Sequence, residues 1–160
     1  MMTAWPEPSE RNLYLQQHVA RLVYSFNHWT GRNLVDSDIP MAEQARRLFY
    51  APFALLSHNA APDPVFNYAN RAGLTLFELT WSEWVTLPSR VSAEPVHQAE
   101  REQLLATVAR QGYIDNYRGV RVTKRGRRFL IEQATVWNLL DENAGHCGQA
   151  AMFSDWKFVD

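Results

Sequence analysis

Residues 65–90, VFNYANRAGLTLFELTWSEWVTLPSR, decide the fold of this chain. The stretch begins with a short β-prone segment, Val65 to Tyr68, which follows a Pro-Asp-Pro turn signal. Asn70 stands where a helix N-cap is expected, because apolar residues follow it at helical spacing. Thr80 offers a second helix start. The stretch therefore predicts a strand that leads into two short capped helices.

Three longer strands are predicted in the C-terminal part, where the apolar pattern changes from a helical period to alternation. They span residues 114–123, 127–140 and 145–156, with polar turn residues between them. Such turns predict an antiparallel meander. The middle strand is apolar on both faces near residues 134–140, so we expect both faces of the sheet to be covered there. A helix over residues 94–111 is expected to precede this meander.

The N-terminal part is predicted to be helical. An amphipathic helix is expected from Ser9 to about Trp29, with Gly31 as its C-terminal cap and one apolar face formed by Leu15, Val19, Leu22, Val23 and Phe26. A shorter helix should follow over residues 40–50, and a short strand over residues 53–56 should pair with the Val65 strand as a hairpin. We therefore predict an N-terminal helical extension, residues 1–50, and a sheet domain, residues 51–160.

Composition limits the classes of protein that need to be considered. The chain has 160 residues, of which 46% are hydrophobic and 21% charged, as in ordinary globular domains. Its net charge of −1 makes nucleic acid an improbable partner, and its single cysteine excludes an intrachain disulfide. No secretory signal and no apolar run of the ~20 residues that span a bilayer are found. We expect a cytoplasmic protein with no membrane contact.

The order of the predicted elements and a series of motifs resemble the MEKHLA family of PAS-like domains. The similarity covers most of the chain. The motifs that carry it are APFALLSH (51–58), DPVFNYANRA (63–72), LFELTW (76–81), LPSRVSAEP (87–95), GYIDNYRGVRV (112–122), GRRF (126–129), ATVWNLLDE (134–142) and GQAAMFSDW (148–156).

This resemblance implies an α+β fold: a PAS-like five-stranded antiparallel sheet with helices on one face, here preceded by the amphipathic N-terminal helix. The family occurs as a free-standing bacterial form and as a C-terminal domain of plant class III homeodomain leucine-zipper transcription factors, where it is linked to control of dimerisation. We expect the free-standing bacterial type. The resemblance carries no established catalytic or ligand residues across.

A PAS-like fold can hold a small molecule between its sheet and its helices. The candidate ligand-binding residues are polar or aromatic residues among core positions: Asn67, Arg71, Trp84, Arg90, Tyr117, Arg121, Trp137 and Gln149, with Thr135 as a further polar position. Each has a structural alternative. Arg90 and Arg121 could form ion pairs with Glu94 or Glu132, and the tryptophans could simply belong to the core.

The identity of a cofactor cannot be predicted from these residues. A light-sensing flavin domain needs a reactive cysteine in the helical segment, whereas Cys147 falls in the last predicted strand. The five histidines show no metal-ligand spacing, so we predict no structural metal. Nucleophile elbows, phosphate-binding loops and dinucleotide fingerprints are missing, so no catalytic residues are predicted and an enzyme is kept only as the alternative.

Three functions remain open. The first is a PAS-like sensory or regulatory module that binds a small molecule or a protein partner, as a homodimer through the N-terminal helix and the sheet. The second is a small enzyme that uses the same pocket on an anionic substrate. The third is a nucleic-acid adaptor that uses the basic hairpin 118–128, although a solvated turn explains that run of charge better.

Overall fold

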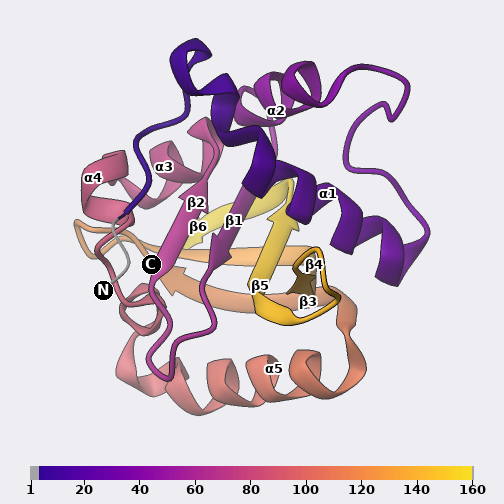
Figure 1. Ribbon diagram of the computed structural model, residues 1–160. Coiled ribbons are helices and arrows are strands. Elements are labelled where there is room, and N and C mark those ends of the chain that lie inside the picture. Colours follow the sequence, from indigo (N-terminus) through magenta and orange to yellow (C-terminus); the bar gives the residue numbers. More distant parts are fainter. Residues whose placement is uncertain (1–3, 160) are drawn as a thin grey trace.

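The computed structural model describes residues 4–159, and Figure 1 shows its helices and strands along the chain. The helices come mainly before the long strands, as the sequence predicts. In chain order the elements are η1 (Glu10–Leu15), α1 (Gln16–Thr30), α2 (Met41–Phe49), β1 (Ala54–His58), β2 (Phe66–Ala69), α3 (Arg71–Phe77), α4 (Trp81–Trp84), η2 (Ser89–Ser92), η3 (Pro95–His97), α5 (Gln98–Gln111), β3 (Tyr113–Val122), β4 (Arg128–Leu140), β5 (His146–Phe153) and β6 (Asp155–Val159).

The strands form one antiparallel sheet in the order β2-β1-β5-β4-β3, with β6 also paired to β4. The hairpin of the first two strands and the meander of the last three are confirmed. Strand β1 lies between β2 and β5. The first strand of the chain therefore pairs with a strand from its C-terminal part in the interior of the sheet. This arrangement places β1 beside the strand that carries Gln149.

The last predicted strand is wrong in one respect, because it divides at Ser154 into β5 and β6. Strand β5 pairs with residues 135–140 of β4, and β6 pairs with residues 128–132. The long strand β4 therefore pairs with both segments, with β5 before the bend at Ser154 and with β6 after it. The sheet has six strands among the described residues instead of five.

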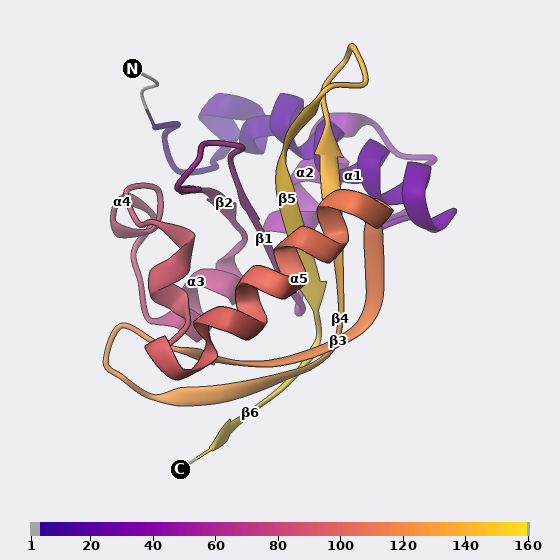
Figure 2. The ribbon, with the colours of Figure 1, turned by 90° about the horizontal axis from the view of Figure 1, so that it is seen from below.

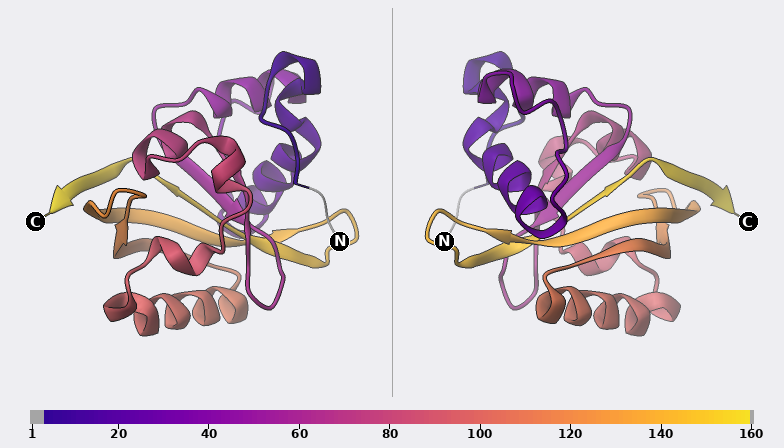
Figure 3. Two further views of the ribbon diagram at one scale, coloured as in Figure 1. Left: turned by 90° about the vertical axis from the view of Figure 1, so that its left-hand side faces the viewer. Right: turned by 90° about the vertical axis from the view of Figure 1, so that its right-hand side faces the viewer.

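Helices cover both faces of the sheet, as the apolar pattern of β4 predicts. Figure 3 shows α1 and α5 on opposite sides of the strands, and Figure 2 shows α5 crossing the sheet obliquely. On one face Phe26 of α1 meets the ring of Trp137 at 4.9 Å between centroids. On the other face Val108 of α5 packs with Val136, the preceding residue of β4. The two faces follow from the alternation of side chains along a strand.

The N-terminal helix is not continuous. Leu13, Tyr14 and Leu15 all have positive φ values, 54–55°, so the chain makes a 3-10 segment and a kink before α1 begins. Tyr14 explains the kink, because its buried ring packs near Phe49 at the end of α2. The predicted end of the helix is confirmed, since Gly31 adopts the left-handed conformation with a φ of 73°.

The predicted caps of the helical region are confirmed. The Asn70 side chain accepts a hydrogen bond from the Gly73 amide at the start of α3. Thr80 and Glu83 form a capping box at the start of α4. The helix predicted over residues 94–111 begins later, because a short 3-10 turn at Pro95–His97 precedes α5.

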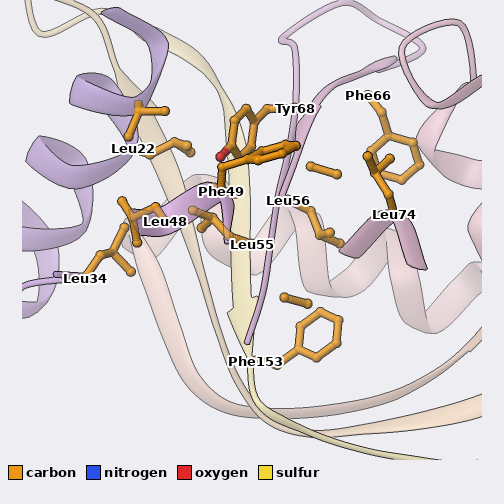
Figure 4. Packing of buried hydrophobic residues seen from close by; sticks show 14 of the residues in the cluster. Leu22, Leu34, Leu48, Phe49, Leu55, Leu56, Phe66, Tyr68, Leu74 and Phe153 are labelled. Atoms are coloured by element: carbon orange, nitrogen blue, oxygen red, sulfur yellow. The ribbon is translucent and has the colours of Figure 1, made fainter. Parts of the chain in front are cut away.

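Side chains of α1 and α2 share one hydrophobic core with the sheet (Figure 4). Leu22 of α1 and Leu48 of α2 are buried together with Leu55 of β1 and Tyr68 of β2. The apolar face that the sequence places on the N-terminal helix is therefore covered by the chain's own sheet. The domain boundary expected near residue 50 stays a prediction.

Candidate functional site

A cavity of about 80 Å³ lies between the sheet and α5. All five strands from β1 to β5 contribute to its floor, and α3, η2 and α5 contribute the rest of its lining. Most of the lining is apolar, with a smaller number of polar residues from several elements, which is the usual make-up of a small-molecule site. The polar residues of the lining are Ser57, His58, Ser89, Ser92, Arg101, Tyr117, Arg121 and Gln149, although the Ser57 hydroxyl is bonded to His18 and Asn67.

Three of the predicted ligand-binding residues, Tyr117, Arg121 and Gln149, line this cavity. Tyr117 and Arg121 are both on β3, and the guanidinium of Arg121 lies 5.7 Å from the centre of the Tyr117 ring. Gln149 is on β5, where its Nε2 donates hydrogen bonds to the Leu105 carbonyl and to Asn138 Oδ1, both at 3.1 Å. The structure therefore brings together residues that are 32 positions apart in the sequence.

Glu100 of α5 meets the β3 side chains at the edge of the cavity. The Tyr117 hydroxyl donates a hydrogen bond to Glu100 Oε2 at 3.1 Å, and Arg121 Nη1 is 3.9 Å from the same oxygen. Burial is the main cause that raises the pKa of Tyr117, to about 12, although the charge of Arg121 opposes this effect. Tyr117 is therefore a neutral hydrogen-bonding group at neutral pH.

Arg101 is the most important residue that the sequence reasoning missed. Its side chain is buried, with 7% of the residue exposed, and its Nη2 donates to the Ser89 hydroxyl. Burial lowers the pKa of Arg101, and the charge of Arg121 lowers it further. A signal was present in the sequence: Arg101, Leu104 and Val108 follow at intervals of three and four, which places the arginine on the buried face of the helix.

His58 is the second missed residue. Its Nδ1 donates to the Asn59 carbonyl at 2.8 Å, because a carbonyl oxygen can only accept. The bare Nε2 is buried and has no hydrogen-bond partner. Burial is the main cause that lowers the pKa of His58, to about 4, so the imidazole is neutral at physiological pH and its Nε2 is an acceptor.

Three predicted polar residues lie away from this cavity. Asn67 of β2 accepts a hydrogen bond from the Ser57 hydroxyl at 2.6 Å. Arg71 is exposed at the start of α3, with its guanidinium 5.7 Å from the centre of the Tyr50 ring. The Thr135 hydroxyl donates to Asp115 at 2.6 Å. Each of these side chains has a partner within the chain.

The two predicted tryptophans belong to the core and do not line the cavity. Trp84 is fully buried, stacks on Phe66 at 3.7 Å between ring centres, and donates its indole N–H to the Tyr68 carbonyl. Trp137 is also fully buried, on the sheet face that α1 covers. Both tryptophans therefore lie in the core, as the alternative interpretation of these positions expects. A ligand-binding role for them stays a prediction.

The ion pair expected for Arg90 forms with a different acid. Arg90 Nε is 3.3 Å from Asp63, whereas Glu94 pairs with Arg128 and Glu132 with Arg118. The reason lies in the backbone, because the Ser89 amide donates to the Pro64 carbonyl and draws η2 against the turn before β2. Both charged side chains are more than half exposed, so the pair contributes little stability.

The basic hairpin between β3 and β4 is rich in ion pairs. Five of its six basic side chains have a carboxylate within 4 Å: Arg118, Arg121, Lys124, Arg127 and Arg128. Their acids come from the C-cap of α3, from α4, β4 and α5, and from the segment before η3. These contacts agree better with a solvated structural turn than with a surface that is free to bind phosphates.

No group of three or more histidine, cysteine or acidic side chains is arranged to hold a metal ion in the part of the chain that the structure describes. Cys147 is half-buried on β5, where burial raises the pKa of its thiol. It is not among the residues that line the cavity. None of the helices between residues 4 and 159 has the length and apolar character to cross a bilayer.

Comparison with known families fits this architecture. The family model described as the MEKHLA domain matches residues 16–158, which is most of the chain. The chain belongs to the MEKHLA domain family. The MEKHLA match begins at the first residue of α1, so it includes the helices that pack on the sheet as well as the strands.

Plant proteins are among the curated relatives of this MEKHLA chain. Homeobox-leucine zipper protein ATHB-14 of Arabidopsis thaliana is 32% identical over 143 residues, which cover 84% of this chain and 16% of that protein. Homeobox-leucine zipper protein HOX33 of Oryza sativa subsp. indica is 31% identical over 160 residues, covering 96% of this chain and 18% of the relative. The chain thus spans less than a fifth of the length of these relatives.

Solved structures with a similar fold are PAS and light-oxygen-voltage domains. A PAS domain from Colwellia psychrerythraea has a TM-score of 0.61 at 15% identity, over 73% of this chain and 94% of that one. An RNA-binding light-oxygen-voltage receptor has the same TM-score at 18% identity, over 79% of this chain and 36% of that one. These similarities show that the MEKHLA chain has a PAS-like fold.

Proposed function

We propose that this MEKHLA domain is a PAS-like sensory or regulatory module that binds a small molecule in the cavity between its sheet and α5. The observation that carries the proposal is the pair of buried arginines, Arg101 of α5 and Arg121 of β3, that line the same cavity. Two like charges that line one buried cavity are costly unless a ligand or a carboxylate neutralises them. Glu100 can neutralise only part of this charge.

Native mass spectrometry of freshly purified protein tests this proposal. Ala134 is buried and lines the cavity, so Ala134→Leu should fill the space without removing a polar group. We expect a retained molecule in the wild type and at least a tenfold lower occupancy in the variant. Ala109→Leu, at an exposed position of α5, is the matched control and should retain the molecule. Equal occupancy in all three proteins would contradict binding in this cavity.

The second candidate, a small enzyme acting on an anionic substrate, is favoured by one observation. A neutral His58 with a bare Nε2 lines the same cavity as two guanidinium groups, which is the arrangement of a general base beside an anion clamp. His58→Gln separates the two functions. An enzyme should lose its turnover while it still binds the substrate anion, whereas a binding module shows no turnover before or after the change.

Homodimerisation through the N-terminal helix is also a proposal. The apolar face of α1 is buried on the chain's own sheet, so a second copy would need the exposed side chains of this segment, such as Leu13 and Tyr24. Light scattering of the wild type and of Tyr24→Glu tests it: a dimer that uses this surface should dissociate in the variant. The free-standing bacterial type and the cytoplasmic location stay predictions.

A further inference from the structure

The charges around the cavity leave one positive charge without a partner. Arg121 and Arg101 supply two cations, and Glu100 supplies one carboxylate, 3.9 Å from Arg121. Among residues 4–159, no acidic side chain lies within 4 Å of Arg101; its hydrogen bond goes to the neutral Ser89 hydroxyl. This one hydrogen bond leaves other N–H donors of the Arg101 guanidinium free to bind a further acceptor. The charged side chains that line the cavity are therefore complementary to an anion, while Glu102 and Asp63 act on Arg101 only from beyond 4 Å.

The cavity also presents an acceptor that nothing in the chain satisfies. His58 Nε2 is buried without a hydrogen-bond partner, while its Nδ1 is held by the Asn59 carbonyl. Leaving such an atom unpaired costs stability, so a hydrogen-bond donor on a ligand would gain from meeting it. His58 and Arg101 line the same cavity, and the charge of Arg101 adds to burial in lowering the pKa of His58. One ligand in this cavity can therefore meet both groups.

Size and polarity limit the rest of the ligand. The cavity of about 80 Å³ is well below the roughly 300–1,000 Å³ of pockets for drug-sized molecules. The remaining wall is apolar and includes Leu56, Phe66, Phe77, Leu104, Ile131 and Phe153. A small apolar skeleton fits these contacts better than a large or highly charged molecule does.

We propose that the ligand is a small monocarboxylic acid that carries a hydroxyl group. Its carboxylate lies against Arg101, Arg121 and the Ser89 hydroxyl, its own hydroxyl donates to His58 Nε2, and its apolar part faces the aliphatic and aromatic wall. This inference rests on the proposed small-molecule function, of which it names the ligand class. The Arg101 guanidinium is the group that selects the anion, and His58 selects the hydroxyl.

Matched sets of small molecules test the class by isothermal titration calorimetry. Two suitable sets are 3-hydroxybutyrate, butyrate and 3-hydroxybutyramide, and 3-hydroxybenzoate, benzoate and 3-hydroxybenzamide. We expect the hydroxy acid of at least one set to bind most tightly, with about tenfold weaker binding without the hydroxyl and about 10- to 100-fold weaker binding when the amide removes the charge. A neutral amide that binds as well as its acid would overturn the proposed class.

Variants connect this selectivity to the two side chains. Arg101→Met should weaken acid binding about 10- to 100-fold, while its melting temperature without ligand stays equal to the wild type or rises, since an apolar side chain replaces a buried charge. Arg90→Met, which breaks only the exposed pair with Asp63, should bind like the wild type. His58→Phe should remove the preference for the hydroxyl. Unchanged acid binding in Arg101→Met would overturn the proposal.

The outcomes separate this inference from the proposed function. One outcome is that none of the acids binds, whereas a neutral or cationic molecule binds to the wild type and not to Ala134→Leu. The ligand class is then wrong and the binding module stands. If neither the two sets nor a retained molecule is bound by the wild type, both the ligand class and the binding function are wrong. Binding of the acids that survives Ala134→Leu would place them elsewhere and would also overturn the proposal.

Discussion

Replacement of Asn70 by alanine is expected to lower the free energy of unfolding by about 3–5 kcal/mol, a large part of the roughly 5–15 kcal/mol that holds a domain folded. Asn70 is fully buried, and its Oδ1 accepts from the amides of Leu55 and Gly73 at 3.0 Å. Its Nδ2 donates to the carbonyls of Leu48 and Phe53 at 3.0 and 2.8 Å. Alanine would leave four backbone groups without this partner.

The four hydrogen bonds of Asn70 connect three segments through one side chain. They tie the end of α2 and the start of β1 to the first turn of α3, so their loss should loosen the helices from the sheet and not only fray one helix end. A simple N-cap is worth about 1 kcal/mol, which is much less than the effect expected here.

Urea unfolding followed by circular dichroism measures this effect. Asn27→Ala is the matched control, because Asn27 is an exposed residue of α1 and alanine is the better helix former there, so we expect a change within about 0.5 kcal/mol. Asn70→Asp keeps the two accepted bonds but sets carboxylate oxygens against two carbonyls, and it should also destabilise the protein. An Asn70→Ala variant within about 1 kcal/mol of the wild type would contradict this bonding scheme.

Mild acid is expected to destabilise the protein through His18 and His58. Burial is the main cause that lowers the pKa of His18 from 6.5 to about 3 and that of His58 to about 4. Below pH 6.5 the unfolded chain therefore binds protons at these histidines that the folded chain does not bind. This contribution to stability is fully present above pH 6.5 and is lost as the pH falls toward the folded pKa values. Each histidine costs up to about 1.4 kcal/mol per pH unit in this window.

The geometry around His18 explains the direction of the shift. Ser57 donates its hydroxyl hydrogen to Asn67, so it accepts from His18 Nε2 at 2.9 Å. His18 Nδ1 is then a bare nitrogen, buried without a partner, and a proton there would be an unpaired buried charge near Arg21. Protonation is unfavourable for this reason and not because of a salt bridge.

Urea midpoints measured from pH 7 to about pH 5 test this prediction. The two histidines together should reduce the free energy of unfolding by about 3–4 kcal/mol over that range, and His18→Gln should remove about half of the slope. Gln17→Ala, at an exposed position of α1 that does not titrate, is the control and should keep the slope of the wild type. A His18→Gln protein with the full wild-type slope would show that His18 is not a source of the acid sensitivity.

The sequence determined much of the architecture of this MEKHLA domain, because local patterns specify local structure. Asn70 and Thr80 mark helix starts by their capping chemistry, Gly31 marks a helix end, and the change from helical period to alternation after residue 112 marks the meander. The double apolar pattern near Trp137 predicted two covered faces. Local patterns did not reveal the bend at Ser154 or the kink at Tyr14, which depend on pairing and packing with distant segments.

Only the tertiary structure decided the site. Tyr117, Arg121 and Gln149 were expected to bind a ligand because they are polar residues among core positions, but that reasoning applied equally to Arg90, which the fold places at an exposed ion pair with Asp63. Arg101 was overlooked among the charges of its helix. A charge pattern along the chain cannot tell which side chains face the same enclosed space, because that depends on how α5 crosses the sheet.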